Sequence, residues 1–186
     1  MSATLSLTED QTYTAMRAFL LGLLPAGVEV IVGQDNRVAE PTASDFVVMT
    51  TMLQERIETN VVTYEDGLLT DPVSGVGKRF DMTPKKVTIQ LDVHGPSSGD
   101  NVNVIASMFR SDYAVDAFAA TGFDVTPLYA SEPHQGPFVN GEQQVEQCWI
   151  CDAVVQCNPI VTTGQQFAAA VTIGVINVDT TYLPRR

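Results

Sequence analysis

The stretch Val87-Thr-Ile-Gln-Leu-Asp-Val-His94, followed by Gly95-Pro-Ser-Ser-Gly-Asp100, decides the fold of this sequence. Its odd-numbered positions up to 93 are Val, Ile, Leu and Val, and polar residues stand between them. This period-two alternation is typical of an antiparallel strand with one buried face. The Gly-Pro pair ends the strand, and Ser-x-x-Asp has the form of a helix start. We therefore predict a strand that turns directly into a helix.

Helix signals occur at three places. Thr8-Glu-Asp-Gln11 has the form of a capping box, and apolar residues follow at helical spacing, so a helix is expected over Thr8–Leu24. A second helix is expected over Ser98–Arg110, with the hydroxyls before it acting as caps. A shorter one is expected over Tyr113–Ala120, closed by Gly122.

Strand-forming residues fill most of the remaining chain. Strands are expected at Val28–Val32, Asp45–Arg56, Thr59–Tyr64, Gln144–Cys157 and Gln165–Val178, and an extended segment at Phe123–Ser131. Pro- and Gly-containing Glu132–Pro137 and Asn158–Gly164 are expected to be loops. The fold class predicted is α+β: a single domain over residues 1–186, with a mostly antiparallel sheet, two or three packed helices and a long flexible loop or hairpin.

The long loop is expected at about residues 65–84. Its Asp-Gly, Asp-Pro and Ser-Gly pairs are turn chemistry, with little apolar periodicity. Loops of this length are usually functional or disordered, and a loop without any role stays open as an alternative. We expect its Gly67–Phe80 part to be disordered or projecting in an isolated subunit and to order against a neighbour or a tail protein on assembly.

Composition narrows the function classes. The 186 residues are 45% hydrophobic and 17% charged, which suits one compact domain. The net charge is −12, and no Lys or Arg lies between Ser111 and Pro184, so tight binding of nucleic acid is not expected. No apolar run reaches the roughly 18 residues of a membrane span, and the N-terminus lacks signal-peptide features, so synthesis in the cytosol is expected.

Three cysteines fall close together, and Cys148-Trp-Ile-Cys151 has the C-x-x-C spacing of zinc and redox sites. A second pair that would complete a zinc site is missing from the sequence, and the surrounding residues favour a strand rather than the helix that a redox motif opens. On a strand the two side chains face opposite sides. We expect Cys148, Cys151 and Cys157 to be reduced, small apolar residues that bind no metal and form no intrachain disulfide.

Asp92 and His94 are the candidate catalytic pair, because residues at i and i+2 of a strand share a face. The sequence has only two histidines and none of the nucleophile, phosphate-loop or metalloprotease motifs that would supply partners. The pair is more typical of a solvated strand face, with a local hydrogen-bonding role near the helix start as the alternative. We predict no catalytic, cofactor or metal site, and no enzyme.

The last strand predicted, Gln165–Val178, is apolar on both faces. A second apolar face indicates a subunit interface, and a strand wholly inside one domain is an equally open reading. The interface is expected to include residues of the long loop and of this strand: Gly67, Leu68, Leu69, Lys78, Arg79, Phe80, Phe167, Val171 and Ile173.

Several blocks, in order, carry a family resemblance: Leu24–Arg37, Asp45–Thr50, Gln90–Pro96, Phe109–Val115, Pro127–Ser131 and Asn140–Glu142. Together they resemble the neck and tail terminator family of tailed phages, which joins head and tail. Each block alone is weak, but the match runs over about Leu24 to Val178. The resemblance implies an α+β fold and no catalytic residues.

The resemblance also implies a structural virion protein in the neck or tail, assembled in the host cytoplasm. It implies a ring, commonly a hexamer of this chain, that caps the tail tube and meets head-side connector proteins. DNA would pass through the ring without specific binding, which suits the acidic composition. The alternatives are a tail-tube or baseplate subunit, or an unrelated α+β protein-binding module.

Overall fold

A computed structural model describes residues 2–33, 41–67, 76–139 and 145–167. Its three helices are α1 (Glu9–Leu23), α3 (Ser98–Met108) and α4 (Asp112–Ala119). The larger sheet has the order β2-β3-β6-β9-β7, formed by β2 (Glu29–Val32), β3 (Phe46–Arg56), β6 (Lys85–His94), β9 (Val145–Cys157) and β7 (Val125–Ala130), and β8 (His134–Val139) also pairs with β9. The smaller sheet has the order β1-β10-β5-β4, formed by β1 (Thr4–Leu5), β10 (Ile160–Gln165), β5 (Gly77–Met82) and β4 (Val61–Glu65). The predicted α+β class is confirmed.

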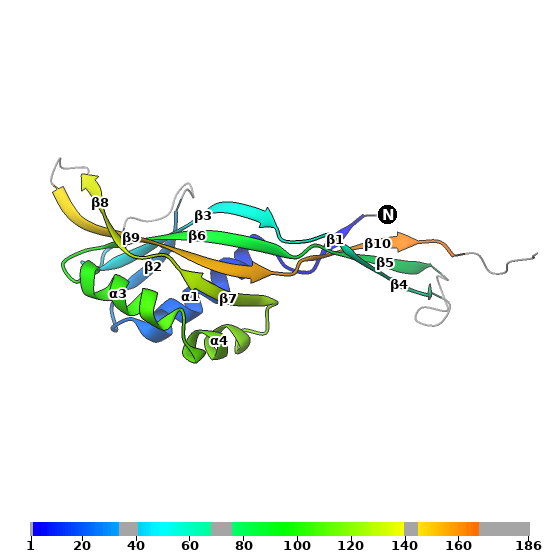
Figure 1. Cartoon of the computed structure of the whole chain (residues 1–186), viewed down its shortest axis with the longest axis horizontal. Coiled ribbons are helices and arrows are strands. Elements are labelled where there is room, and N and C mark those ends of the chain that lie inside the picture. The colour runs from blue at the N-terminus through cyan, green and yellow to red at the C-terminus, as the bar shows by residue number, and fades with distance from the viewer. Residues whose placement is uncertain (1, 34–40, 68–75, 140–144, 168–186) are drawn as a thin grey trace, which may run out of the picture.

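The opening stretch forms β6, at the centre of the larger sheet. Its odd-numbered side chains face the three helices, which lie together on one side of the sheet (Figure 1). Cross-strand register brings Leu91 opposite Met49 of β3 and Cys151 of β9, and all three are fully buried. Burying such apolar side chains is the main favourable term in folding, so the alternating pattern fixes which face the helices cover.

Aromatic rings join the three helices. Phe19 of α1 has its ring centroid 5.5 Å from that of Phe109 and 5.7 Å from that of Phe118. Phe109 and Phe118 meet edge to face at 5.9 Å. All three rings are at most 1% exposed. Edge-to-face pairs add roughly 0.5–1.5 kcal/mol beyond the area that they bury, so this cluster fixes how the helices pack together.

The two main helices start differently. Thr8 caps α1 as predicted: its side chain accepts from the Gln11 backbone, and the Gln11 side chain accepts from the Thr8 backbone. The prediction that a serine hydroxyl caps α3 is wrong, because the Ser97 side chain makes no capping hydrogen bond and Ser98 is buried. The Ser97 amide instead donates to Asp45 Oδ1 over 2.9 Å, from the beginning of β3. The strand-to-helix turn is therefore held by a carboxylate from a neighbouring strand.

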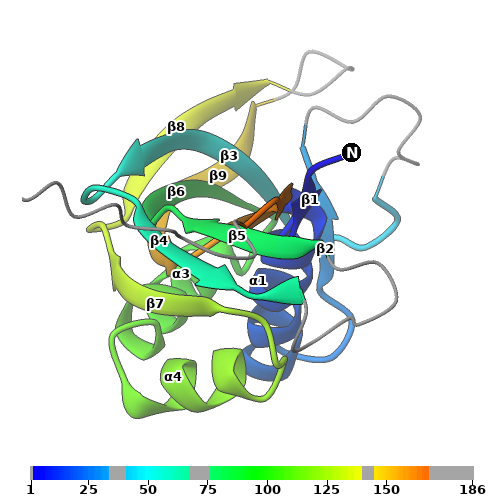
Figure 2. The same cartoon turned by 90° about the vertical axis from the view of Figure 1, so that its right-hand side faces the viewer.

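The smaller sheet continues three strands of the larger one beyond the helices, and we call it the arm (β1, β4, β5 and β10). The order β3-β6-β9 in the body becomes β4-β5-β10 in the arm. The chain bends where the arm joins the body, and two of these bends contain a proline: Pro84 between β5 and β6, and Pro159 between β9 and β10. Backbone hydrogen bonds bridge the strands there: the Ile57 amide donates to the Pro84 carbonyl and the Thr83 amide to the Pro159 carbonyl, each with an N–O distance of 3.0 Å. Figure 1 shows the arm extending away from the helices along the long axis, and Figure 2 views the molecule from the end of the arm, with β4 and β5 in front.

The structure corrects several strand predictions. The segment Glu132–Pro137 was expected to be a loop, but most of it forms β8. The expected connection Asn158–Gly164 contains most of β10, which pairs with β5. The expected strand Gln165–Val178 lies largely outside the described residues. One pair of strands, β2 and β3, is parallel, although the remaining pairs are antiparallel as predicted.

The predicted long loop is shorter than residues 65–84. Its second part is β5, which pairs with β4 in antiparallel register from Val61 opposite Met82 to Glu65 opposite Lys78. The turn-rich composition of this segment wrongly predicted a loop, because strand pairing outweighs local propensity at these positions. The described part is a projecting hairpin, which was one of the two forms predicted. Residues 68–75 lie outside the described residues.

Candidate functional site

The prediction that His94 lies on a solvated strand face is wrong, because the residue is only 4% exposed. Its ring stacks on Phe46 with centroids 4.5 Å apart and meets Phe138 edge-on at 4.6 Å. Nε2 lies 3.9 Å from the Cys148 sulfur, and Nδ1 is buried without a hydrogen-bond partner. Burial lowers the pKa of His94, although the nearby carboxylates of Asp92 and Glu146 act in the opposite direction. His94 is therefore a neutral aromatic spacer between β3 and β8.

Asp92 shares this face of β6 but does not complete a catalytic pair. Its Oδ1 accepts a hydrogen bond from Gln90 Nε2 over 2.7 Å. A general base needs the proton it takes within hydrogen-bond reach, and a metal needs three or more converging ligands. Within the described residues no group of three His, Cys, Asp or Glu side chains could hold a metal ion. The arrangement around Asp92 and His94 supports packing rather than chemistry.

The three thiols are free and buried, and Cys148 and Cys151 face opposite sides of β9 as expected. Cys151 lies in the core under the helices, whereas Cys148 contacts His94. Burial raises the pKa of Cys148 to about 11 and that of Cys151 to about 12. Because the thiolate is the reactive form, both side chains act as small apolar residues at neutral pH.

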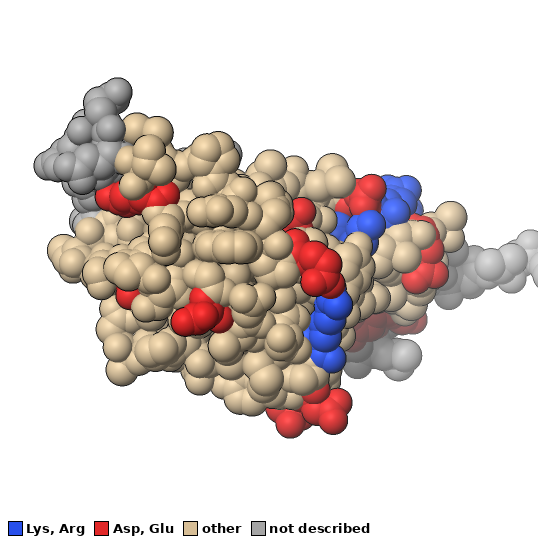
Figure 3. Space-filling model, turned by 60° about the vertical axis from the view of Figure 1, so that its left-hand side comes forward, with Lys and Arg blue, Asp and Glu red and all other residues tan. Residues whose placement is uncertain are grey.

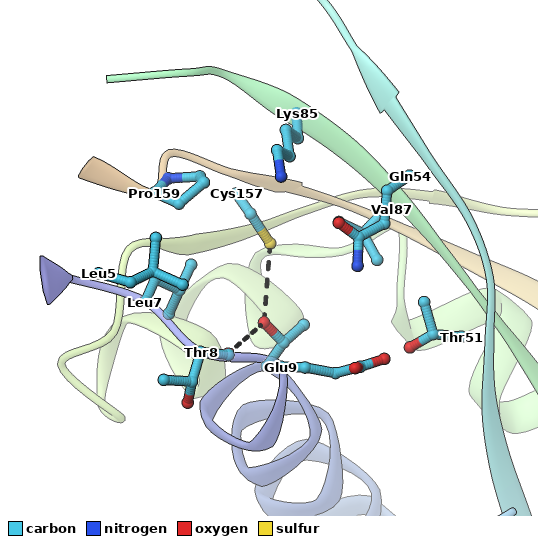
Figure 4. A pocket seen from close by; sticks show the side chains of 11 residues that line it. Leu5, Leu7, Thr8, Glu9, Thr51, Gln54, Lys85, Val87, Cys157 and Pro159 are labelled. Carbon is cyan, nitrogen blue, oxygen red and sulfur yellow. Dashed lines mark hydrogen bonds between the residues drawn. The ribbon is translucent and has the colours of Figure 1, made fainter. Parts of the chain in front are cut away.

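A pocket of about 190 Å³ opens where the arm joins the body (Figure 4). Apolar side chains, including Leu7, Val87 and Pro159, form much of its lining, and Lys85 points into it. Cys157 lies within it with its sulfur 3.9 Å from Thr12 Oγ1, and burial raises the pKa of this thiol. The thiolate is the nucleophilic form of cysteine, so the raised pKa disfavours a reactive Cys157. The pocket therefore offers a surface for packing rather than a reaction centre.

The predicted interface residues fall mainly on the arm. Lys78, Arg79 and Phe80 lie in β5, and Gly67 is buried just after β4. Phe167, near the end of β10, is 45% exposed. Leu68, Leu69, Val171 and Ile173 lie outside the described residues. The structure thus brings the four described loop residues and Phe167 together on the arm.

Sequence reasoning missed the apolar exposure of the arm. Val61, Val62 and Tyr64 of β4 are 45%, 37% and 57% exposed, and neighbouring Ile57 is 48% exposed. Val-Val-Thr-Tyr was recognised as a strand, but nothing in its pattern indicates that neither face is covered. The missing signal is tertiary, because a strand with apolar residues on successive positions normally lies inside a sheet with both faces covered.

Charge is unevenly distributed. In the described chain the body carries the basic residues Arg17 and Arg110, and the other five lie in the arm or at its root: Arg56, Lys78, Arg79, Lys85 and Lys86. Arg79 pairs with Asp81 over 2.7 Å, and Lys86 with Glu55 over 2.6 Å. Figure 3 shows a broad face of the body on which charged side chains are sparse. Such a surface gives no footprint for nucleic acid, which requires clustered Lys and Arg.

Among the described residues, no helix combines the length and hydrophobicity that crossing a bilayer requires. The arrangement as a whole provides a helix-covered body, an exposed arm and no reaction centre in its described part. The exposed apolar side chains of the arm are typical of a surface that contacts other proteins.

Comparison with known proteins agrees with this reading. No curated protein matches the sequence. A solved structure described as "Cryo-EM Structure of an Extracellular Contractile Injection System, PVC sheath/tube terminator in extended state" has 10% identity and a TM-score of 0.48, and the alignment covers 95% of this chain and 66% of that chain. This chain thus spans slightly less than two thirds of that protein, and so distant a likeness carries no argument. The sequence model of the phage neck terminator protein matches residues 10–185, and the chain therefore belongs to the phage neck terminator family.

Proposed function

We propose that this protein ends a phage tail by forming a closed ring that caps the tail tube and presents its other face to the head-side connector. The family match over residues 10–185 carries this proposal. The family gives the chain a tail-terminating structural role in the virion tail. That role requires no catalysis, so we expect no enzymatic activity and no cofactor. A ring of six subunits is the size that the family resemblance favours.

The shape of the subunit supports a ring. An arm on one side of the body suits a head-to-tail contact, in which the same two different surfaces meet at each step. Such contacts close into a ring when the rotation per step divides a full turn. A stable contact needs roughly 1,000 Å² or more of buried surface in total. The exposed apolar residues of β4 are candidates for part of that area.

The charge supports a passage for DNA rather than a binding site. With a net charge of −12 on each subunit, the ring would repel the phosphate backbone over about one Debye length, roughly 8 Å at physiological salt. A duplex could then slide through with little sticking. The expected protein partners are further copies of this chain, the tail-tube protein and the head-side neck proteins, assembled in the host cytoplasm.

Removing the protein from an assembling phage tests this function. Full heads lying apart from tails of irregular or excessive length would support termination and joining. Intact virions with tails of normal length would refute it. Electron microscopy of the purified protein separates the main alternative, because a tail-tube subunit would polymerise into long stacks whereas a terminator should stop at a single ring.

A further inference from the structure

The two described sheets have four edges, and three of them are protected. At the edge of the larger sheet, β2 is four residues long, and its Val30 carbonyl accepts a hydrogen bond from Arg17 Nε over 3.1 Å. The opposite edge is formed by β7 and β8, which contain Pro127 and Pro137. In the arm, β1 is two residues long. Short strands and prolines are the usual means by which proteins prevent an edge from pairing with another chain.

The fourth edge, β4, has none of these protections. Its sequence Val61-Val-Thr-Tyr64 contains no proline, glycine or charge before Glu65. Among the described strands it pairs with β5 alone, so no described strand meets the backbone N–H and C=O groups of its other side. Its side chains are exposed on both faces. An exposed edge of strand-forming residues is a template for the addition of another strand.

The chain ends its described part beside this edge. Phe167 follows β10, and its ring contacts Tyr64 of β4 with centroids 6.0 Å apart at 89°. The ring crosses β5 at Gly77, where any side chain would collide with it. Gly77 is therefore required for this contact. A further 19 residues follow Phe167, and the first 11 of them, residues 168–178, contain no charge.

We propose that residues 168–178 of one subunit add as a strand to the free edge of β4 of a neighbouring copy. This inference rests on the proposed function and names the contact that would link subunits in the ring. Residues 168–178 read Ala-Ala-Ala-Val-Thr-Ile-Gly-Val-Ile-Asn-Val, and the β-branched residues among them favour an extended conformation. Main-chain hydrogen bonds would hold the added strand, and the exposed valines of β4 would contact its side chains.

A neighbouring copy suits this geometry better than the same chain. The ring of Phe167 lies against Gly77 and Tyr64 on one face of the arm, at the end where β10 finishes. The connection between β4 and β5 leaves from the same end of the arm, and a strand returning to its own β4 would have to pass around it. Two uncharged segments can also meet without repulsion between chains that each carry a net charge of −12.

Disulfide trapping between separately labelled copies tests the contact. One variant carries Val62→Cys, and three partners carry Ala169→Cys, Val171→Cys or Ile173→Cys. The native thiols do not compete, because they are buried and the pKa values of Cys148 and Cys151 are about 11 and about 12. After mixing and mild oxidation, we expect a disulfide-linked dimer of Val62→Cys with at least one partner. Val104→Cys on α3, also exposed, is the matched control and should give none.

Absence of a linked dimer with all three partners would overturn the proposal. So would a disulfide confined to one chain in a doubly substituted Val62→Cys, Ile173→Cys protein, because it would place the segment on its own β4. A second measurement uses Val62→Lys, which sets a charge on the edge, with Val104→Lys as the control. We expect Val62→Lys to raise the protein concentration needed for ring assembly by about tenfold or more, and Val104→Lys to leave it unchanged.

These results separate the contact from the function. If the wild-type protein forms rings and Val62→Lys forms them equally well, the edge-strand contact is wrong while tail termination stands. If the phage lacking this protein makes normal tails, the proposed function is wrong whatever the trapping shows.

Discussion

Replacing His94 by phenylalanine should remove a dependence of stability on pH while keeping the packing. The imidazole lies between Phe46 and Phe138, and a phenyl ring can make both aromatic contacts. It would also remove the buried Nδ1 that has no partner, a relief of about 1–3 kcal/mol. The larger ring opposes this gain, because overpacking costs about 1–3 kcal/mol. At neutral pH we therefore expect the free energy of unfolding to change little.

The difference between the proteins should appear below the ordinary histidine pKa of 6.5. Burial lowers the pKa of His94 in the folded protein, and the carboxylates of Asp92 and Glu146 offset only part of this effect. Below pH 6.5 the unfolded chain therefore binds a proton that the folded chain does not, and wild-type stability falls. Above that pH the contribution is constant. For one proton the loss between pH 6.5 and pH 5.5 is at most about 1 kcal/mol.

Urea unfolding of the wild type and His94→Phe at pH 7.5, 6.5 and 5.5 measures this difference. The stability of the variant relative to the wild type should rise as the pH falls from about 6.5 to about 5.5. His134→Phe, at an exposed position on β8, is the matched control for replacing a histidine by phenylalanine. A relative stability of His94→Phe that stays constant, or falls, as the pH decreases would refute the account of a neutral, buried imidazole.

Three further predictions concern the fold and the thiols. Thr8→Ala removes the side-chain cap of α1 and should lower the free energy of unfolding by about 1 kcal/mol in urea titrations; no change would mean that the capping box of Thr8 and Gln11 is not formed. Phe19→Ala leaves a cavity between three helices and should cost about 3–5 kcal/mol, whereas the same change at exposed Phe167 should cost far less. The native protein should react slowly with a thiol reagent, react fast once unfolded, and contain no stoichiometric zinc by metal analysis, because its three thiols are buried with raised pKa values.

The sequence predicted the elements whose signals are local. The capping box at Thr8 and Gln11 and the alternation in β6 each depend on residues within one segment, and both predictions are confirmed. The same alternation identified the core face of the larger sheet, which includes Leu91. Patterns of this kind persist because the buried face of an element is fixed by the element's own periodicity.

Predictions failed where the deciding partner is distant in sequence. Pro133 and Pro137 suggested a loop, but β8 is an edge strand, on which a residue without an N–H group is tolerated. Thr162, Thr163 and Gly164 suggested a connection, but β5, about eighty positions away, pairs with them. His94 looked solvated because its cover, Phe138, comes from a later strand. No local pattern reports such contacts.

The arm is the part of the described structure that the proposed assembly would use. Its strand order follows that of the body, where β3, β6 and β9 pack against helices, but beyond the bends no described helix covers either face of the arm (Figure 1). Small sheets need a packed hydrophobic face to be stable. Leaving strand-forming residues such as Val61 and Tyr64 exposed does not help the isolated subunit, and it carries a risk of unwanted pairing. A partner that binds only the folded arm would stabilise it by mass action, so the arm should be most ordered when subunits have assembled.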